Sequence, residues 1–294
     1  MSRVFQALKR AGLGAPQPGE SSPDPPAPDA GEASPPESPR APEAPILLHD
    51  PLFSAPRPFG TPTKVVLDEK ARLIPHTVDP SVVEHYRRLR TKILQQQTNS
   101  HFHTLMVTSP GPQEGKTVTV VNLGLSFALL PSFKVLMVDG DLRRGSLGSW
   151  LGIAEGCPGL SNLIEGSAKL EDVVLQCDDT PFAFVVRGNS KAPPADLLQS
   201  SQLPGHFRAM AKHFDLVLVD SPPVNLLTDT QLLAAGCDAV LLIARAFSTT
   251  NKALKNALQD LAPFNVIGTV LNGGPKSRLG WRNRSYYYYR GQQK

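Results

Sequence analysis

The feature that most constrains the fold of this chain is a series of short, continuous apolar runs separated by segments of helical character. The runs lie at 105–107, 134–139, 182–188, 214–220, 239–244 and 264–272. Strands that are apolar throughout, rather than alternately apolar and polar, are typical of parallel sheets covered on both faces. We therefore expect an α/β fold, in which a mostly parallel sheet is flanked by helices on both faces.

A helix is predicted before the first run, from residue 81 onward. Its apolar stripe has the spacing of a buried helix face and consists of Val82, Tyr86, Leu89 and Ile93. The opposite side carries the charged residues Glu84, Arg87, Arg88 and Arg90. An exposed Glu–Arg pair stabilises a helix by only ~0.2–0.5 kcal/mol, so these charges alone indicate a solvated face.

The composition divides the chain into segments. Residues 14–62 hold 15 of the 29 prolines, and such a segment buries too little apolar surface to offset the entropy of ordering it. We expect a disordered Pro-rich linker there, with a structured Pro-rich ligand for a partner as the alternative. Residues 1–13 are expected to form a short amphipathic helix or a frayed terminus. Residues 78–273 suit one domain, and 274–294 form a basic tail.

Several classes of protein are disfavoured. No apolar run approaches the ~20 residues of a membrane span, and the N-terminus lacks the apolar core of a secretory signal. The cysteines Cys157, Cys177 and Cys237 show neither metal-ligand spacing nor a disulfide framework. A net charge of +4 is too mild to argue for a nucleic-acid partner. The sequence thus predicts a cytoplasmic protein that does not bind nucleic acid.

Three apolar runs are followed by loops that carry chemically active residues: SPGPQEGKT, DGDLRR and DSPPV. Ligands of parallel sheets bind at the carboxyl ends of the strands, so we expect these loops to lie together. In the first loop, Lys116 can reach outer phosphates and the Thr117 hydroxyl can bind magnesium. The strict pattern G-x4-G-K-[ST] fails, because Pro110 stands at its first glycine.

Three aspartates strengthen this prediction. Asp139 and Asp220 end two of the runs, and Asp141 lies just beyond the first of them. Carboxylates beside a phosphate loop can hold magnesium or orient an attacking hydroxyl, although a single one would more simply cap the following turn. Together with Gly115, Lys116 and the residue that follows, they predict a site for ATP and Mg²⁺.

With these motifs in place, residues 75–294 resemble the bacterial tyrosine kinases of capsule and exopolysaccharide synthesis, within the MinD-like P-loop ATPases. SPGPQEGKT is similar to their variant Walker A motif, with Gln113 in place of a glycine. VDGDLRR is similar to their second acidic motif, and LVLVDSPP to Walker B. Gly145 replaces a usual proline, and Val118 a common second hydroxyl residue.

The resemblance implies an ATP-dependent protein-tyrosine autokinase that regulates polysaccharide synthesis or export. Its catalytic residues would be Lys116, Asp139, Asp141 and Asp220. Its cofactor-binding residues would be Gln113, Glu114, Gly115, Lys116, Thr117, Val118, Arg143 and Asn272. Its magnesium ligands would be Thr117, Asp139 and Asp220. Whether Asp139 or Asp141 accepts the tyrosine proton stays open.

The tail contains four consecutive tyrosines, which cannot all face a core from a helix or a strand. They are Tyr286, Tyr287, Tyr288 and Tyr289. The resemblance implies that they are phosphorylated, and an aromatic membrane anchor is the alternative. We expect phosphorylation in trans, although the length of the tail also allows it in cis. The resemblance also implies that Glu84, Arg87 and Arg90 contact a neighbour in a ring-type homo-oligomer.

The resemblance further implies a separate membrane-anchored activator, which recruits the chain to the inner face of the plasma membrane, and a tyrosine phosphatase. Two other functions stay open. A MinD- or ParA-like ATPase switch would resemble a loop whose first lysine falls at Gly111, where the lysine is absent. A non-catalytic, nucleotide-binding assembly regulator would share every binding residue.

Overall fold

A computed structural model describes residues 60–65, 80–177 and 182–274. The predicted helix at 1–13, most of the predicted linker and the tyrosine cluster lie outside the described residues.

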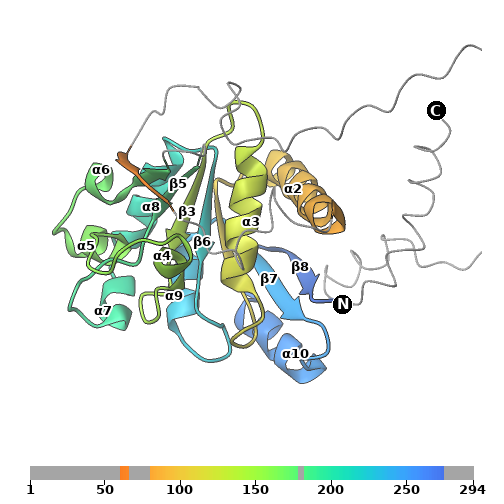
Figure 1. The fold of residues 1–294 in the computed structure, drawn as a ribbon. Coiled ribbons are helices and arrows are strands. Elements are labelled where there is room, and N and C mark those ends of the chain that lie inside the picture. Colours follow the sequence, from red (N-terminus) through yellow and green to blue (C-terminus); the bar gives the residue numbers. More distant parts are fainter. Residues whose placement is uncertain (1–59, 66–79, 178–181, 275–294) are drawn as a thin grey trace, which may run out of the picture. The chain divides into compact units, whose positions relative to one another are not determined.

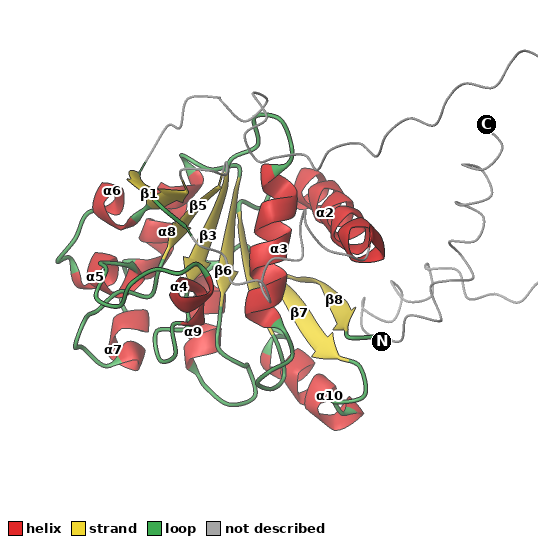
Figure 2. Cartoon of the chain, in the orientation of Figure 1, coloured by secondary structure: helices red, strands yellow, loops and turns green. Residues whose placement is uncertain are grey.

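The described strands form one eight-stranded sheet in the order β1-β4-β5-β3-β6-β2-β7-β8 (Figures 1 and 2). They are β1 (Thr61–Thr63), β2 (Thr104–Thr108), β3 (Val135–Asp139), β4 (Leu175–Cys177), β5 (Phe182–Val185), β6 (Leu216–Asp220), β7 (Ala239–Arg245) and β8 (Val266–Asn272). Neighbouring strands run parallel except β4 and β5, which are antiparallel. Each predicted apolar run overlaps one strand, so the predicted α/β fold is confirmed.

Helices cover both faces of the sheet (Figure 1). They are α2 (Pro80–Ser100), α3 (Lys116–Ala128), α4 (Ser146–Trp150), α5 (Leu160–Glu165), α6 (Leu170–Val173), α7 (Pro194–Leu198), α8 (Leu203–Ala211), α9 (Asp229–Gly236) and α10 (Asn251–Asp260). One core joins the sheet to α2, α3 and α4, and a second joins it to α5 through α10. Along β2, Leu105 and Val107 belong to one core and Met106 to the other, which is why this strand is apolar throughout.

Strands β1 and β4 were not predicted, and β1 corrects the end of the predicted linker at 14–62. Thr61 and Pro62 lie in β1, which runs parallel to β4. The backbone N–H of Thr61 donates a 2.9 Å hydrogen bond to the Val174 carbonyl oxygen. These backbone bonds order a Pro-containing segment that composition alone assigns to a linker. Thr61 and Pro62 therefore do not belong to the predicted linker.

Helix α2 confirms the predicted helix and its apolar stripe. Ile93 is buried, and Tyr86 and Leu89 pack against the same core. The charged residues divide into two groups. On the exposed side, Glu84 Oε2 lies 3.1 Å from Arg87 Nη1, and Glu84 Oε1 lies 3.0 Å from Arg88 Nε.

Arg90 is not in that group, although the sequence placed it in the same exposed stripe as Glu84 and Arg87. Its guanidinium donates a hydrogen bond to the backbone carbonyl of Ser126, near the end of α3. Burial is the main cause that lowers the pKa of Arg90. This arginine therefore joins α2 to α3 within one chain.

None of the helices in the described ranges combines the length and apolarity needed to cross a membrane.

Candidate functional site

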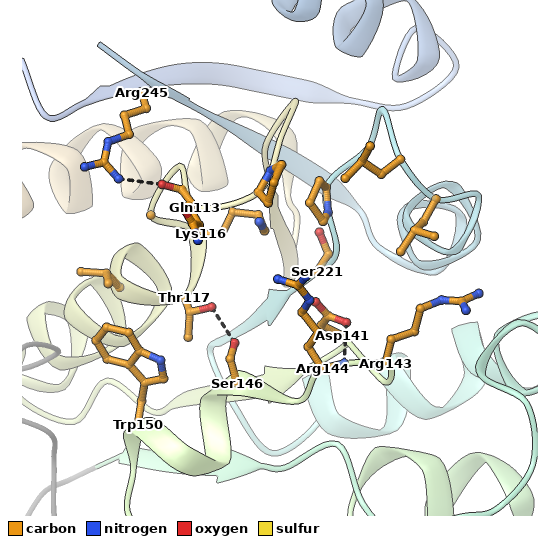
Figure 3. A pocket seen from close by; sticks show the side chains of 16 residues that line it. Gln113, Lys116, Thr117, Asp141, Arg143, Arg144, Ser146, Trp150, Ser221 and Arg245 are labelled. Atoms are coloured by element: carbon orange, nitrogen blue, oxygen red, sulfur yellow. Dashed lines mark hydrogen bonds between the residues drawn. The ribbon is translucent and has the colours of Figure 1, made fainter. Parts of the chain in front are cut away.

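The three loops that the sequence singled out follow β2, β3 and β6, which are neighbours in the sheet. Asp139 and Asp220, the last residues of β3 and β6, are register partners. A cavity of about 520 Å³ opens beside these strand ends (Figure 3). The predicted site residues that line it are Gln113, Gly115, Lys116, Thr117, Val118, Asp141 and Arg143. The expected convergence of the three loops is therefore observed.

The phosphate loop, residues 109–117, has two residues in the left-handed backbone region. Gly115 has φ 95°, and a Cβ atom added to it would lie 2.1 Å from Asn272 Nδ2. Glycine is therefore required at 115 for both conformation and space. Gln113 has φ 58°, so it holds the conformation that favours the glycine usual at this position of the resembled family.

Helix α3 begins at Lys116, so the free N–H groups of its first turn lie at the end of the phosphate loop. The Lys116 ammonium donates a 3.2 Å hydrogen bond to Ser109 Oγ. Burial lowers the pKa of Lys116, while the carboxylates of Asp220 and Asp141 act in the opposite direction. A helix N-terminus joined by a partly desolvated ammonium is a favourable place for an anion such as a phosphate.

The carboxylate of Asp220 contacts the hydroxyl group of Thr117 in the site. Thr117 Oγ1 donates a 2.5 Å hydrogen bond to Asp220 Oδ2, and the Ser221 N–H donates to Oδ1 at 3.1 Å. Asp220 is almost fully buried. Burial raises its pKa to about 6, opposed by the Thr117 hydroxyl and by Lys116.

Asp139 and Asp141 have different surroundings. Asp139 is fully buried, and its two carboxylate oxygens accept backbone N–H groups of Asp141 at 3.2 Å and of Leu147 at 2.9 Å. Burial, and then the charge of Asp220, raises the pKa of Asp139 well above its ordinary range. Asp141 lines the cavity, and its Oδ1 accepts the Arg144 N–H at 3.1 Å (Figure 3). Of these two carboxylates, Asp141 is the one that faces the cavity.

Metal binding is supported by the type of donor rather than by a cluster of ligands. Within the described residues, no group of three or more His, Cys, Asp or Glu is placed to hold a metal ion. The Thr117 hydroxyl and the Asp220 carboxylate instead form a close pair. Magnesium binds through one or two such oxygens and completes its shell with phosphate oxygens and water, so this pair fits it.

Three predicted cofactor-binding residues contribute in other ways. Arg143 makes a bidentate pair with buried Asp229, at 2.6 Å and 3.1 Å, and also lines the cavity. Glu114 is 5% exposed, and its carbonyl accepts a 3.0 Å hydrogen bond from Asn272 Nδ2. Glu114 and Asn272 do not line the cavity; Glu114 is part of the phosphate loop, and Asn272 contacts that loop from the end of β8.

Sequence reasoning missed several lining residues. Ser146 Oγ lies 2.9 Å from Thr117 Oγ1, and Trp150 follows on the same helix α4 (Figure 3). Arg245 reaches the loop from the end of β7, where its guanidinium donates to the Gln113 carbonyl at 2.7 Å. A usable signal existed for Arg245, because it directly follows the predicted apolar run 239–244 at the same edge of the sheet. The sequence offers no such signal for Trp150.

Comparison with known proteins gives close relatives. No protein-family model matches the chain. The tyrosine-protein kinase CpsD of Streptococcus pneumoniae is 32% identical over 193 residues, which cover 64% of this chain and 83% of that protein. The tyrosine-protein kinase ptk of Acinetobacter johnsonii is 31% identical over 205 residues. That match covers 69% of this chain and 28% of the relative, which is much longer.

Solved structures agree with this comparison. The kinase domain of the Escherichia coli tyrosine kinase ETK has a TM-score of 0.66 and 28% identity, over 72% of this chain and 84% of that chain. MinD of Pyrococcus horikoshii, solved with Mg-ADP, has a TM-score of 0.50 and 21% identity, over 59% of this chain and 72% of that one. The second match is a likeness of fold alone.

Proposed function

The chain belongs to the bacterial tyrosine kinases, and from that premise we propose that it is an ATP-dependent protein-tyrosine autokinase. Its acceptors are the tyrosines of the cluster Tyr286–Tyr289, phosphorylated in trans, and its role is to regulate capsule or exopolysaccharide synthesis or export. The chain spans less than a third of the length of some relatives, so the activity of those whole proteins is a proposal for this chain.

One observation carries the proposal. The cavity at the carboxyl edge of the sheet brings Lys116, Thr117 and Asp141 together at the start of α3, with the Asp220 carboxylate 2.5 Å from the Thr117 hydroxyl. An ammonium, a hydroxyl–carboxylate pair and a second carboxylate are the groups that phosphoryl transfer from a magnesium nucleotide requires.

Each residue has a distinct task. When bound, ATP would supply the phosphoryl group and Mg²⁺ part of the charge neutralisation. Lys116 and the N–H groups of the loop bind the phosphates, and Thr117 with Asp220 holds the metal. Asp141 accepts or orients the tyrosine hydroxyl proton, because it faces the cavity, whereas both oxygens of Asp139 already accept backbone N–H groups. We assign to Asp139 the role of shaping the loop that carries Asp141.

The partners follow from the same proposal. The chain forms a ring-type homo-oligomer in which a tail enters a neighbour's site. A separate membrane-anchored activator brings it to the inner face of the plasma membrane, and a tyrosine phosphatase removes the phosphates.

The test uses the purified chain, γ-labelled ATP and magnesium, with detection of phosphotyrosine. Wild type should label its own tail. Lys116→Met should abolish labelling and leave the melting temperature close to that of wild type, because the hydrogen bond of the Lys116 ammonium within the described residues is a single long one, to Ser109 Oγ. Labelling of Lys116→Met at the wild-type rate would refute the site. Release of phosphate by wild type without any phosphotyrosine would instead favour an ATPase switch.

A further inference from the structure

The end of β7 and the turn after it contact the phosphate loop through the side chains of Arg245 and Thr249. We propose that Thr249, together with Arg245, is a positioning residue that holds the phosphate loop in its nucleotide-binding conformation. Thr249 acts through the buried carboxyl group of Glu114. The inference deepens the proposed function, because it rests on this loop being the one that binds nucleotide phosphates.

Two consecutive carbonyl groups of the loop are held by side chains from the ends of neighbouring strands. Arg245 Nη1, at the end of β7, donates to the Gln113 carbonyl at 2.7 Å (Figure 3). Asn272 Nδ2, at the end of β8, donates to the Glu114 carbonyl at 3.0 Å. Strand β7 lies between β2 and β8, so the loop after β2 is fixed by the two strands on one side of it.

Thr249 connects these contacts through a single hydroxyl group. Its Oγ1 donates to Glu114 Oε1 at 2.8 Å and accepts the backbone N–H of Arg245 at 2.7 Å. Glu114 Oε2 is buried and has no hydrogen-bond partner within the described residues. The Thr249 hydroxyl is the stronger hydrogen-bond partner of the Glu114 carboxyl group, and the Gly111 backbone is the weaker one. Loss of the Thr249 hydroxyl is therefore costly for this buried group.

The loop needs such external bonds because its backbone is locally unfavourable. Gln113 has φ 58° without being a glycine, a conformation that persists only where the surroundings enforce it. If the bonds to the loop were lost, the loop would populate other conformations. Apparent nucleotide affinity then falls in proportion to the competent fraction.

The test compares Thr249→Val with the conservative variant Thr249→Ser and with the matched control Thr250→Val. Thr250 is the next residue, and its hydroxyl accepts the Ala253 N–H at 3.1 Å at the start of α10 instead of contacting the loop. Two quantities are measured: affinity for Mg·ADP by calorimetry, and hydrogen–deuterium exchange of residues 111–117 in the nucleotide-free protein.

We expect Thr249→Val to weaken Mg·ADP binding about threefold to tenfold, the effect of one lost hydrogen bond, and to speed exchange in the loop. Thr249→Ser should restore both values, and Thr250→Val should change neither. Wild-type values for Thr249→Val, or equal changes in Thr250→Val, would overturn the inference. If wild type failed to bind Mg·ADP, the proposed function would fall, and the exchange measurement would still decide whether Thr249 holds the loop.

Discussion

Asp220 is a residue whose role in the site lowers the stability of the fold. It ends β6 beside Asp139, the last residue of β3, and both carboxyl groups are almost fully buried. Burial disfavours the ionised form of both, and the charge of Asp220 also raises the pKa of Asp139. Binding a metal ion requires Asp220 as an anion. The free protein therefore gives up stability in order to keep a site ready for a cation.

A first prediction follows for Asp220→Asn in the free protein. The folded-state pKa of about 6 lies above the ordinary value of 3.8, so between these values the folded state holds a proton that the unfolded chain has released. Wild-type stability therefore falls as the pH rises through this window and stays lower above it. Asparagine does not ionise, so the variant should be more stable than wild type at pH 7.5, by on the order of 1–3 kcal/mol.

The difference in the free energy of unfolding between Asp220→Asn and wild type should narrow as the pH falls towards 4. Urea denaturation at several pH values between 4.5 and 7.5 measures it, and calorimetry should show that the same variant has lost magnesium-dependent nucleotide binding. A variant that is less stable than wild type at pH 7.5, or a gap that does not change with pH, would contradict the assignment.

Helix α2 combines a packing role with a proposed assembly role, and the structure separates the two. Arg90 donates to the Ser126 carbonyl, one of the last carbonyls of α3, which have no partner within their own helix. Glu84 and Arg87 pair with each other on the exposed side. The first contact stabilises one chain, whereas the second leaves its charges accessible to a neighbour.

We expect Arg90→Ala to lower the free energy of unfolding by about 1 kcal/mol, because it removes a hydrogen bond from a charged donor. The double variant Glu84→Ala/Arg87→Ala should change stability by less than about 0.5 kcal/mol, since exposed pairs contribute little. It should nevertheless give a smaller oligomer than wild type by light scattering. Equal masses, under conditions where wild type is oligomeric, would exclude this pair from the contact between subunits.

The elements of the fold were predictable to different degrees, for physical reasons. Five strands are buried almost throughout, so their apolar runs identify them: β2, β3, β5, β6 and β7. Strand β8, at the edge of the sheet, is only partly buried, but its sequence is also an apolar run. Strands β1 and β4 have three residues each and are defined by backbone pairing, which leaves no comparable pattern. In the site, Lys116 and Asp220 stand at strand and helix ends that the motifs mark. Thr249 and Ser146 were missed, because their contacts depend on which elements become neighbours, a property of the tertiary structure.

At the scale of the whole molecule, the tail begins close to the site. Strand β8 ends at Asn272, which contacts the phosphate loop, and the tail begins two residues later. From Gly274 to Tyr286 a chain can extend by roughly 40 Å. That length would reach the site of the same chain or that of a neighbour. Chain length therefore does not distinguish phosphorylation in cis from phosphorylation in trans.

Mixing two variants, neither of which can phosphorylate its own tail, decides this most directly. The acceptor is the Lys116→Met chain, which keeps its tyrosines, and the donor is a chain with Tyr286 through Tyr289 changed to Phe. The two are distinguished by mass after incubation with ATP and magnesium, and phosphotyrosine is located by mass spectrometry. We expect phosphate on the tail of the Lys116→Met chain, although neither variant labels itself. An unmodified acceptor, in a mixture where wild type alone phosphorylates its tail, would contradict transfer between chains.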